Sequence, residues 1–146
     1  MDYSGRPGVG VCVLIYKEGK ILLGKRHDDP VKADSELQGA GKWTVPGGKL
    51  DFGEDIIEGA KREAKEECDI DVHDTELVSL TNDIKGERHF ITVGFLAKEF
   101  SGEPKTMEPD EITEWRWFPV DQLPQPIFFP AEKAIKNFLA GEQMKY

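Results

Sequence analysis

Long hydrophobic runs are missing from this sequence. No segment approaches the roughly 18 consecutive apolar residues that a membrane-spanning helix requires. The N-terminal segment also lacks a basic leader and a small-residue cleavage site, so a secretory signal is not expected. With 38% hydrophobic and 32% charged residues, the composition is that of a folded, soluble protein. We therefore expect a cytoplasmic protein without a membrane partner.

Positive charge is also scarce. The chain has 19 Lys and Arg residues against 28 Asp and Glu residues, which gives a formal net charge of −9. Such a surface repels the phosphate backbone that supplies most nonspecific affinity for nucleic acids. A polymeric nucleic-acid partner is therefore not expected. A small phosphorylated ligand stays compatible with this charge, because cations can neutralise it within one pocket.

Cysteine is nearly absent. Cys12 and Cys68 lie far apart and have neither the CxxC spacing nor a neighbouring His residue. This pattern excludes a disulfide framework and a zinc site of the common spacings. We expect two buried free thiols in a reducing compartment.

Local patterns predict a mixed α/β domain spanning residues 1–146. The first half predicts a hairpin of residues 8–16 and 21–26, a mobile surface loop over 27–42 followed by a short segment at 43–45, and a helix over 55–68. The second half predicts strands at 76–81 and 89–100 around a turn at 83–87, a loop at 101–113, a strand at 114–118 and a closing helix at 131–140.

Three glutamates, Glu63, Glu66 and Glu67, have the spacing i, i+3 and i+4 in the first predicted helix. Residues at this spacing share a helix face, so the carboxylates would project toward one point. Like charges so placed destabilise a helix by roughly 0.2–0.5 kcal/mol per pair. A hard divalent cation with oxygen ligands would offset this repulsion. We interpret the segment, which follows Gly47 and Gly48, as a magnesium site.

The spacing of Gly48, Glu54 and the run REAKEECDI, which begins at Arg62, resembles the Nudix box. The similarity continues in HFITVGF and LPQPIFFP and covers roughly residues 7–140. It is closest to the MutT-like branch that cleaves nucleoside triphosphates, which includes oxidised-purine sanitising enzymes. The resemblance implies the Nudix fold, in which a mixed β-sheet is sandwiched between helices. It also implies a magnesium-dependent pyrophosphohydrolase that releases a nucleoside monophosphate and pyrophosphate from a nucleoside triphosphate, including an oxidised or otherwise modified deoxynucleotide.

The resemblance assigns roles to individual residues of the motif. It implies Mg²⁺, for which Mn²⁺ can substitute, held by the Gly47 carbonyl, Glu63, Glu66 and Glu67. The catalytic set implied is Glu66, Glu67, Arg62 and Glu54. Arg62 is expected to orient Glu66 and neighbouring acids rather than to touch substrate, and Glu54 to link the loop to the helix N-terminus.

The general base is open at this point. Glu66 or Glu67 is the first choice, and four acids of the downstream loop are alternatives: Glu108, Asp110, Glu111 and Glu114. Each of these four, taken alone, is better explained as part of a solvated acidic turn. Glu111 ranks first among them.

A base pocket is implied at four positions, His89, Thr92, Phe128 and Phe129. His89 and Thr92 belong to a predicted strand, and the two phenylalanines could stack on a nucleobase. Ordinary core packing explains the phenylalanines about equally well.

One position departs from the motif. Asp69 stands where the family carries a Gly that suits the left-handed backbone after a helix. Asp is among the few other residues that tolerate this conformation, so we expect a small stability cost and an intact site.

Alternative functions remain open from the sequence. The motif recognises a diphosphate and not what is attached to it, so a nucleoside diphosphate linked to another group, such as ADP-ribose or a nucleotide sugar, is the rival substrate. A catalytically weak, nucleotide-sensing module is a rival of another class, and an acidic helix without a metal is the third. The sequence leaves a homodimer open as well.

Overall fold

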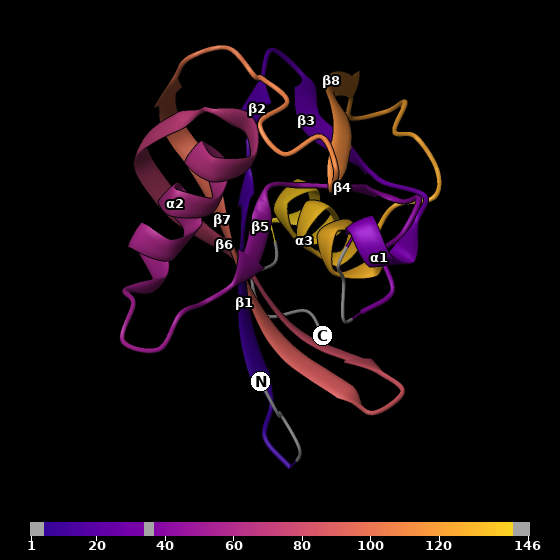
Figure 1. Ribbon diagram of the computed structural model, residues 1–146. Helices are drawn as coiled ribbons and strands as arrows, with labels where there is room; N and C mark the ends of the chain where they lie inside the picture. Colours follow the sequence, from indigo (N-terminus) through magenta and orange to yellow (C-terminus); the bar gives the residue numbers. More distant parts are fainter. Residues whose placement is uncertain (1–4, 34–36, 142–146) are drawn as a thin grey trace.

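The computed structural model describes residues 5–33 and 37–141. Within these ranges the chain forms eight strands and three helices (Figure 1). In chain order they are β1 (Gly8–Leu14), β2 (Tyr16–Lys17), β3 (Lys20–Arg26), α1 (Pro30–Ala33), β4 (Trp43–Thr44), β5 (Gly47–Lys49), α2 (Ile56–Cys68), β6 (Asp71–Lys85), β7 (Arg88–Ser101), β8 (Ile112–Pro119) and α3 (Phe129–Ala140).

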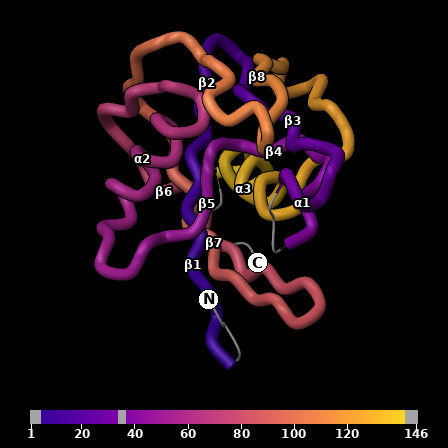
Figure 2. The backbone as a smooth tube through the Cα atoms, viewed as in Figure 1, coloured from indigo at the N-terminus to yellow at the C-terminus, as the bar shows by residue number. Residues whose placement is uncertain are grey.

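The expected mixed sheet is present and has the strand order β5-β1-β7-β6. Strands β1 and β7 pair in parallel, whereas β1 with β5 and β6 with β7 pair antiparallel. A second sheet contains β2, β3 and β4, with β8 on the other edge of β3. The path of the tube in Figure 2 shows β6 and β7 running together as one long hairpin.

The predicted hairpin of residues 8–16 and 21–26 is wrong for its longer part. Only β2 pairs with β3 across the tight turn, and β1 joins the other sheet. The two long strands therefore lie in different sheets. Each is apolar enough to be buried on both faces, so local pattern does not distinguish a shared sheet from two separate ones.

Helices cover both faces of the mixed sheet, as expected. Along β1, Val11 and Val13 belong to one apolar cluster, and Cys12 and Leu14 belong to another. The first cluster is closed by α2 and the second by α3. Because successive strand residues point to opposite faces, β1 contributes to two cores at once. Burying each of its larger apolar side chains stabilises the fold by about 1.5–3 kcal/mol.

Helix α2 begins and ends as its sequence predicts. The carboxylate of Asp55 accepts hydrogen bonds from the backbone N–H groups of Ile57 and Glu58 and so caps the first turn. Asp69 follows the last turn with φ 59° and ψ 33°, in the left-handed region. The expectation that Asp takes the left-handed position is confirmed.

Other elements differ from the predictions mainly in length. Strand β6 extends well beyond the predicted 76–81, whereas β7 exceeds the predicted 89–100 by one residue at each end, and the connecting turn shrinks to residues 86 and 87. The predicted loop over 27–42 contains the short helix α1, and its residues 34–36 lie outside the described ranges. Two residues of the short segment 43–45 form β4, and the predicted strand at 114–118 and helix at 131–140 are confirmed as β8 and α3.

Both cysteines are buried free thiols, as predicted. Burial raises the pKa of each to about 12, so neither thiol is ionised near neutral pH. Trp115 and Trp117 pack against the same apolar cluster beside α2, so they share a face of β8. Within the described residues, no helix combines the length and apolar character needed to cross a membrane.

Candidate functional site

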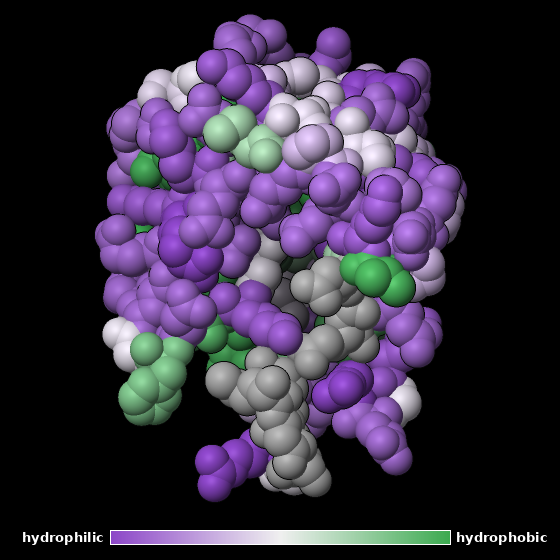
Figure 3. All heavy atoms as spheres, viewed as in Figure 1, coloured by the Kyte–Doolittle hydropathy of each residue, from purple (hydrophilic) through white to green (hydrophobic). Residues whose placement is uncertain are grey.

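A cavity of about 400 Å³ opens between α2, the mixed sheet and the segment that leads into α3. Its volume is within the range of sites that bind small organic molecules. One end is lined by the glutamates of α2 and by β5, and the other by Phe90, Thr92 and Phe128. Hydrophilic side chains predominate on the face of the molecule drawn in Figure 3, in keeping with the net charge of −9.

Gly47 and Gly48 belong to β5, which pairs with β1. Glycine is needed at both positions, because a side chain at either one would collide with its surroundings. A Cβ atom at Gly47 would lie 2.5 Å from the carbonyl oxygen of Val11. A Cβ atom at Gly48 would lie 2.6 Å from Oε1 of Glu63. The two glycines therefore let the strand approach both β1 and the carboxylate of α2.

Glu63 and Glu67 lie one helical turn apart and line the cavity, although only 9% and 8% of their surface is exposed. Oε2 of Glu67 accepts a hydrogen bond from the Gly47 N–H at 2.9 Å. Burial raises the pKa of Glu63 to about 7, against the opposing charge of Arg62. Burial, and then the charge of Glu63, raises the pKa of Glu67 well above its usual range. Both carboxylates thus carry a charge that their surroundings disfavour.

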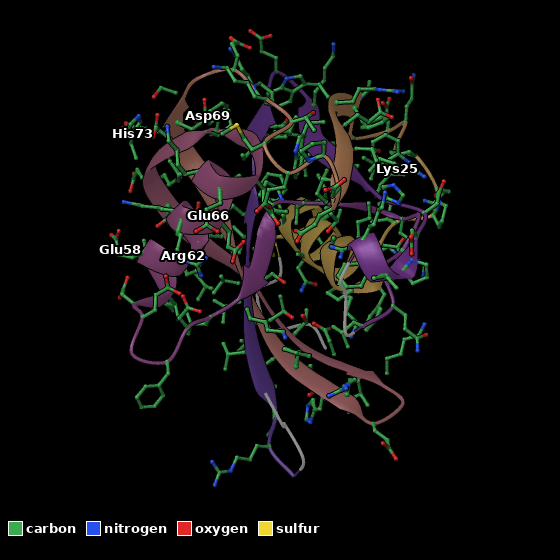
Figure 4. The ribbon with its side chains drawn as sticks, in the orientation of Figure 1. Lys25, Glu58, Arg62, Glu66, Asp69 and His73 are labelled. Carbon is green, nitrogen blue, oxygen red and sulfur yellow. The ribbon has the colours of Figure 1, made fainter. Side chains whose placement is uncertain are left out.

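Arg62 connects the acids around this end of the cavity. Its Nε and Nη2 donate to the two carboxylate oxygens of Glu54 at 2.7 and 3.0 Å. Its Nη1 donates to Glu63 at 3.0 Å and to Glu66 at 3.2 Å, and Nη2 reaches the Lys49 carbonyl. Figure 4 shows Arg62 and Glu66 together on α2. This matches the expected orienting role of Arg62, which also lines the cavity.

Glu54 links the loop to the helix, as expected from its place before α2. Besides binding Arg62, it accepts a hydrogen bond from the backbone N–H of Asp51 at 3.1 Å. The hydrogen bonds from Arg62, followed by that from Asp51, lower the pKa of Glu54 to about 2. Glu54 is therefore ionised throughout the physiological range.

The donor set suits a hard divalent cation, since Glu63 and Glu67 offer oxygen ligands whose negative charge is poorly solvated. Gly48 also leaves room for the Glu63 carboxylate where a Cβ atom would stand. Among the residues that the structure describes, no three His, Cys, Asp or Glu side chains are grouped as a preformed cation site. Here Arg62 lies between Glu63 and Glu66, and the N–H of Gly47 contacts Glu67. The ligand roles, including that of the Gly47 carbonyl, stay predictions.

Two of the four downstream acids reach the cavity. Glu108 and Glu111 line it, and Asp110 and Glu114 lie outside the lining. Partial burial, followed by the charges of Glu111 and Glu66, raises the pKa of Glu108. The structure therefore narrows the alternatives for a general base in this loop to Glu108 and Glu111.

Two of the four residues expected at a base pocket line the cavity, and the base-binding role stays a prediction. Thr92 and Phe128 line the cavity, but His89 and Phe129 do not. His89 pairs with Asn82 instead. It stands three positions before Thr92 on β7, an odd spacing that directs the two side chains to opposite faces, and its neighbour Phe90 takes the cavity position.

Phe129 is placed beside the cavity rather than in it. Its ring meets that of Phe128 edge-on, with centroids 5.9 Å apart. The ammonium groups of Lys85 and Lys133 lie 5.9 and 5.6 Å from its centroid. Phe129 therefore supports Phe128 and contacts cations.

Sequence reasoning missed a buried polar cluster behind the cavity. Asp83, assigned to a turn, is fully buried in β6, where it contacts Thr81, Thr92 and Lys133. The alternation of Thr81 and Asp83 two residues apart was a usable signal for one strand face. The contact with Lys133 spans 50 residues of sequence and had no local signal.

Comparisons with known proteins agree with this geometry. The NUDIX domain family model matches residues 6–138. An ADP-ribose pyrophosphatase of Methanocaldococcus jannaschii is 32% identical over 135 residues, which covers 91% of this chain and 73% of that protein. An oxidized purine nucleoside triphosphate hydrolase of Danio rerio is 32% identical over 136 residues, covering 87% of this chain and 80% of that protein.

A solved structure of similar sequence has the same fold as this chain. The crystal structure of a MutT NUDIX hydrolase from Burkholderia pseudomallei superposes with a TM-score of 0.80 at 34% sequence identity. The match covers 90% of this chain and 98% of that one. The expected fold, a mixed sheet between helices with α and β elements intermixed, is confirmed.

Proposed function

This chain belongs to the NUDIX family and is a hydrolase of nucleotide pyrophosphate bonds, and from that premise we propose that it cleaves a nucleoside triphosphate to a nucleoside monophosphate and pyrophosphate with Mg²⁺. An oxidised or otherwise modified deoxynucleotide is included in this proposal. Mn²⁺ is the expected substitute ion.

One observation carries the proposal. A single cavity has buried carboxylates and a Gly-Gly strand at one end, and an aromatic ring with a hydroxyl at the other. The first end suits a cation and a polyphosphate, because the glycines allow close approach of the backbone. The second end suits a nucleobase, because Phe128 offers a ring face for stacking. A nucleotide likewise has a polyphosphate at one end and a nucleobase at the other.

The reaction adds water across a phosphoric anhydride. The water oxygen forms a bond to phosphorus, the bridging P–O bond breaks, and the water proton passes to a base. Mg²⁺, held by Glu63, Glu66 and Glu67 with the Gly47 carbonyl, would supply positive charge against the developing negative charge of the phosphoryl oxygens. Ionised Glu63 and Glu67 are disfavoured by burial, so they gain most from a cation.

For the general base we propose Glu67 or Glu66. Glu67 is held at the cavity wall by the Gly47 N–H, and burial raises its pKa well above the usual range, which makes the carboxylate a stronger base. Glu66 is half-exposed and paired with Arg62. Glu111 and Glu108, which also line the cavity, are the alternatives.

Arg62 and Glu54 are proposed to act by positioning. Arg62 fixes Glu63 and Glu66 relative to each other, and the two hydrogen bonds to Glu54 fix the guanidinium. Such a planar fork loses little further freedom when it binds a carboxylate. The pair therefore holds the acids in place for the cation and the diphosphate.

A second candidate substrate is ADP-ribose or another nucleoside diphosphate derivative. It is favoured by the relative named ADP-ribose pyrophosphatase, whose identity to this chain equals that of the triphosphate hydrolase relative. The carboxylate end of the cavity would serve either substrate, because both contain the same diphosphate linkage.

The test is a substrate panel with the purified chain. It contains unmodified, oxidised and methylated nucleoside triphosphates, ADP-ribose, nucleotide sugars and a 5′-triphosphorylated RNA, each with Mg²⁺ and with chelator. We expect triphosphate turnover that stops on chelation. Turnover that survives chelation would end the metal mechanism, and exclusive turnover of ADP-ribose would select the second candidate. Binding without any turnover would favour the nucleotide-sensing module.

A further inference from the structure

Behind the base end of the cavity lies a charged group that the proposed reaction does not use. Asp83 on β6 has 0% of its side chain exposed, and its Oδ1 forms an ion pair with Nζ of Lys133 on α3 at 2.9 Å. Its Oδ2 accepts two hydroxyl hydrogen bonds, from Thr92 at 2.6 Å and from Thr81 at 2.9 Å. A buried carboxylate that is paired in this way stays fixed in place.

The bond to Asp83 determines what Thr92 offers to the cavity. A threonine hydroxyl has one hydrogen and two lone pairs. In Thr92 that hydrogen points to Asp83, so the oxygen faces other groups only as an acceptor. Thr81 donates to the same carboxylate oxygen, but it is 1% exposed and lies outside the cavity lining. The two threonines thus share a partner, and only Thr92 can meet a ligand.

The space in front of Thr92 is kept open by Gly10 on the neighbouring strand. A Cβ atom at Gly10 would lie 3.6 Å from Oγ1 of Thr92, so a larger side chain there would cover the hydroxyl. Gly10 and Phe128 also line the cavity. A planar ring that stacks on Phe128 would therefore present its edge to polar groups of the cavity wall.

We propose that Asp83, paired with Lys133, is a positioning residue that fixes Thr92 as a hydrogen-bond acceptor for an exocyclic amino group of the nucleobase. The inference rests on the proposed function and adds a selection rule to it. A base with an amino group at this edge can donate to Thr92. A base with an oxo group there would place lone pairs against lone pairs, and a base with hydrogen there would leave the buried acceptor unpaired.

The test compares substrates that differ only in one exocyclic amino group. The pairs are guanine against hypoxanthine nucleotides and adenine against purine nucleotides, as triphosphates with Mg²⁺. We expect kcat/KM to favour the amino member of at least one pair by about tenfold or more, the effect of one unsatisfied buried polar group. Equal kcat/KM within both pairs would overturn the proposal.

Matched threonine variants locate the effect. Thr92→Val keeps the shape and removes the acceptor, so it should abolish the preference. Thr92→Ser should keep it. Thr81→Val removes the second hydroxyl hydrogen bond to Asp83 without changing the cavity lining. We expect the amino preference to survive in this variant. Loss of the preference in Thr81→Val as well, or its survival in Thr92→Val, would contradict the assignment.

A test of the role of Asp83 needs a variant that does not leave the Lys133 ammonium without its counter-charge. Asp83→Asn combined with Lys133→Met removes both charges and allows the amide to donate to Thr92, which frees the Thr92 hydrogen for a ligand. The freed hydroxyl hydrogen should then favour an oxo group over an amino group, and a comparison of hypoxanthine with adenine nucleotides measures this shift. A folded double variant that keeps the wild-type preference would show that Asp83 does not set it.

Binding separates this inference from the proposed function. Calorimetry with GMP against IMP, and AMP against purine riboside monophosphate, measures the same contact without turnover. If triphosphates are not hydrolysed but the amino preference in binding depends on Thr92, the proposed function fails and the base contact stands. If triphosphates are hydrolysed with no preference in turnover or binding, the base contact fails alone.

Discussion

Arg62 holds Glu54 through two nearly parallel hydrogen bonds, from Nε to Oε2 at 2.7 Å and from Nη2 to Oε1 at 3.0 Å. The remaining Nη1 reaches Glu63 and Glu66. One guanidinium therefore ties the start of α2 to the acids on its following turns. A lysine has the same charge but cannot form this planar fork.

We expect Arg62→Lys to lower kcat/KM by about tenfold or more, because Glu63 and Glu66 lose their common anchor. Thermal unfolding should show a folded protein. Arg116→Lys is the matched control, since Arg116 is exposed, lies over the rings of Trp43 and Phe118 and, among the carboxylates that the structure describes, bonds only to nearby Glu114. Steady-state kinetics of both variants check the prediction, and full activity in Arg62→Lys would contradict it.

Glu67→Gln should reduce turnover by at least about 100-fold, because a neutral amide neither binds a cation strongly nor accepts a proton. The stability of the fold should not decrease. The amide oxygen can still accept the Gly47 hydrogen bond, and the substitution removes a charge that burial disfavours. We therefore expect an unchanged or higher Tm.

The control for Glu67→Gln is Glu58→Gln, an exposed residue in the first turn of the same helix. It should retain activity and lose a few tenths of a kcal/mol at most, through its interaction with the helix dipole. A Glu67→Gln protein with near wild-type turnover would show that the site is assigned wrongly.

The stability of the metal-free protein should depend on pH between about 4.5 and 7. The pKa of Glu63 is raised from 4.5 to about 7 in the folded state, so the folded state binds more protons than the unfolded state in this interval. Stability therefore falls as the pH rises through the interval, and ionised Glu67 adds to the same trend. Glu54 has the opposite shift, to about 2, and its contribution is lost only below pH 4.5.

Thermal unfolding with chelator across pH 4.5–8 measures this dependence. We expect Tm to fall toward pH 8, and Glu63→Gln to flatten the slope. Addition of Mg²⁺ should raise Tm more at pH 8 than at pH 5, because the ligands must be deprotonated to bind it. A Tm that rises with pH in the presence of chelator would contradict the predicted sign.

Local periodicity predicted much of this site. The helix and its acid face were visible in the sequence because i, i+3 and i+4 positions share a face whatever surrounds them. The placement of Arg62 against Glu66 followed from the same rule. What the spacing missed was that Glu63 and Glu67 are buried while Glu66 is half-exposed. That difference depends on β5, which lies against one side of the helix.

Contacts between distant segments explain the remaining errors. The parallel pairing of β1 with β7 joins strands about 80 residues apart, and no local pattern reports it. His89 is a different case, because it stands three positions before Thr92 and an odd spacing in one strand already directs the two side chains to opposite faces. Asp83 was taken for a turn residue because charged residues are rarely buried unless paired, and its partner Lys133 is 50 residues away.

Gly48→Ala should impair the activity of the site without destabilising the fold. Its Cβ would lie 2.6 Å from Oε1 of Glu63, so the carboxylate must move, whereas the backbone of Gly48 needs no special conformation. We expect turnover to fall by about tenfold or more and the apparent Mg²⁺ requirement to rise, with little change in Tm. Activity titrated against Mg²⁺ measures both effects. Unchanged Mg²⁺ dependence would mean that the position of Glu63 does not matter for the cation.

Replacing Asp69 by Gly should cost less stability than replacing it by Ala. Its φ of 59° suits Gly and strains Ala, and its carboxylate pairs with the exposed Lys65 and Lys105 at 3.0 and 3.5 Å. Asp69→Ala should lower Tm by about 3 °C, because it keeps the strain and loses both pairs. In Asp69→Gly the relief of strain offsets the lost pairs, and the offset should improve at high salt, which screens exposed pairs. Both variants should keep wild-type turnover, since Asp69 lies beyond the cavity lining. A loss of turnover in Asp69→Gly, measured at a temperature where the protein stays folded, would show instead that this residue helps to position Glu67.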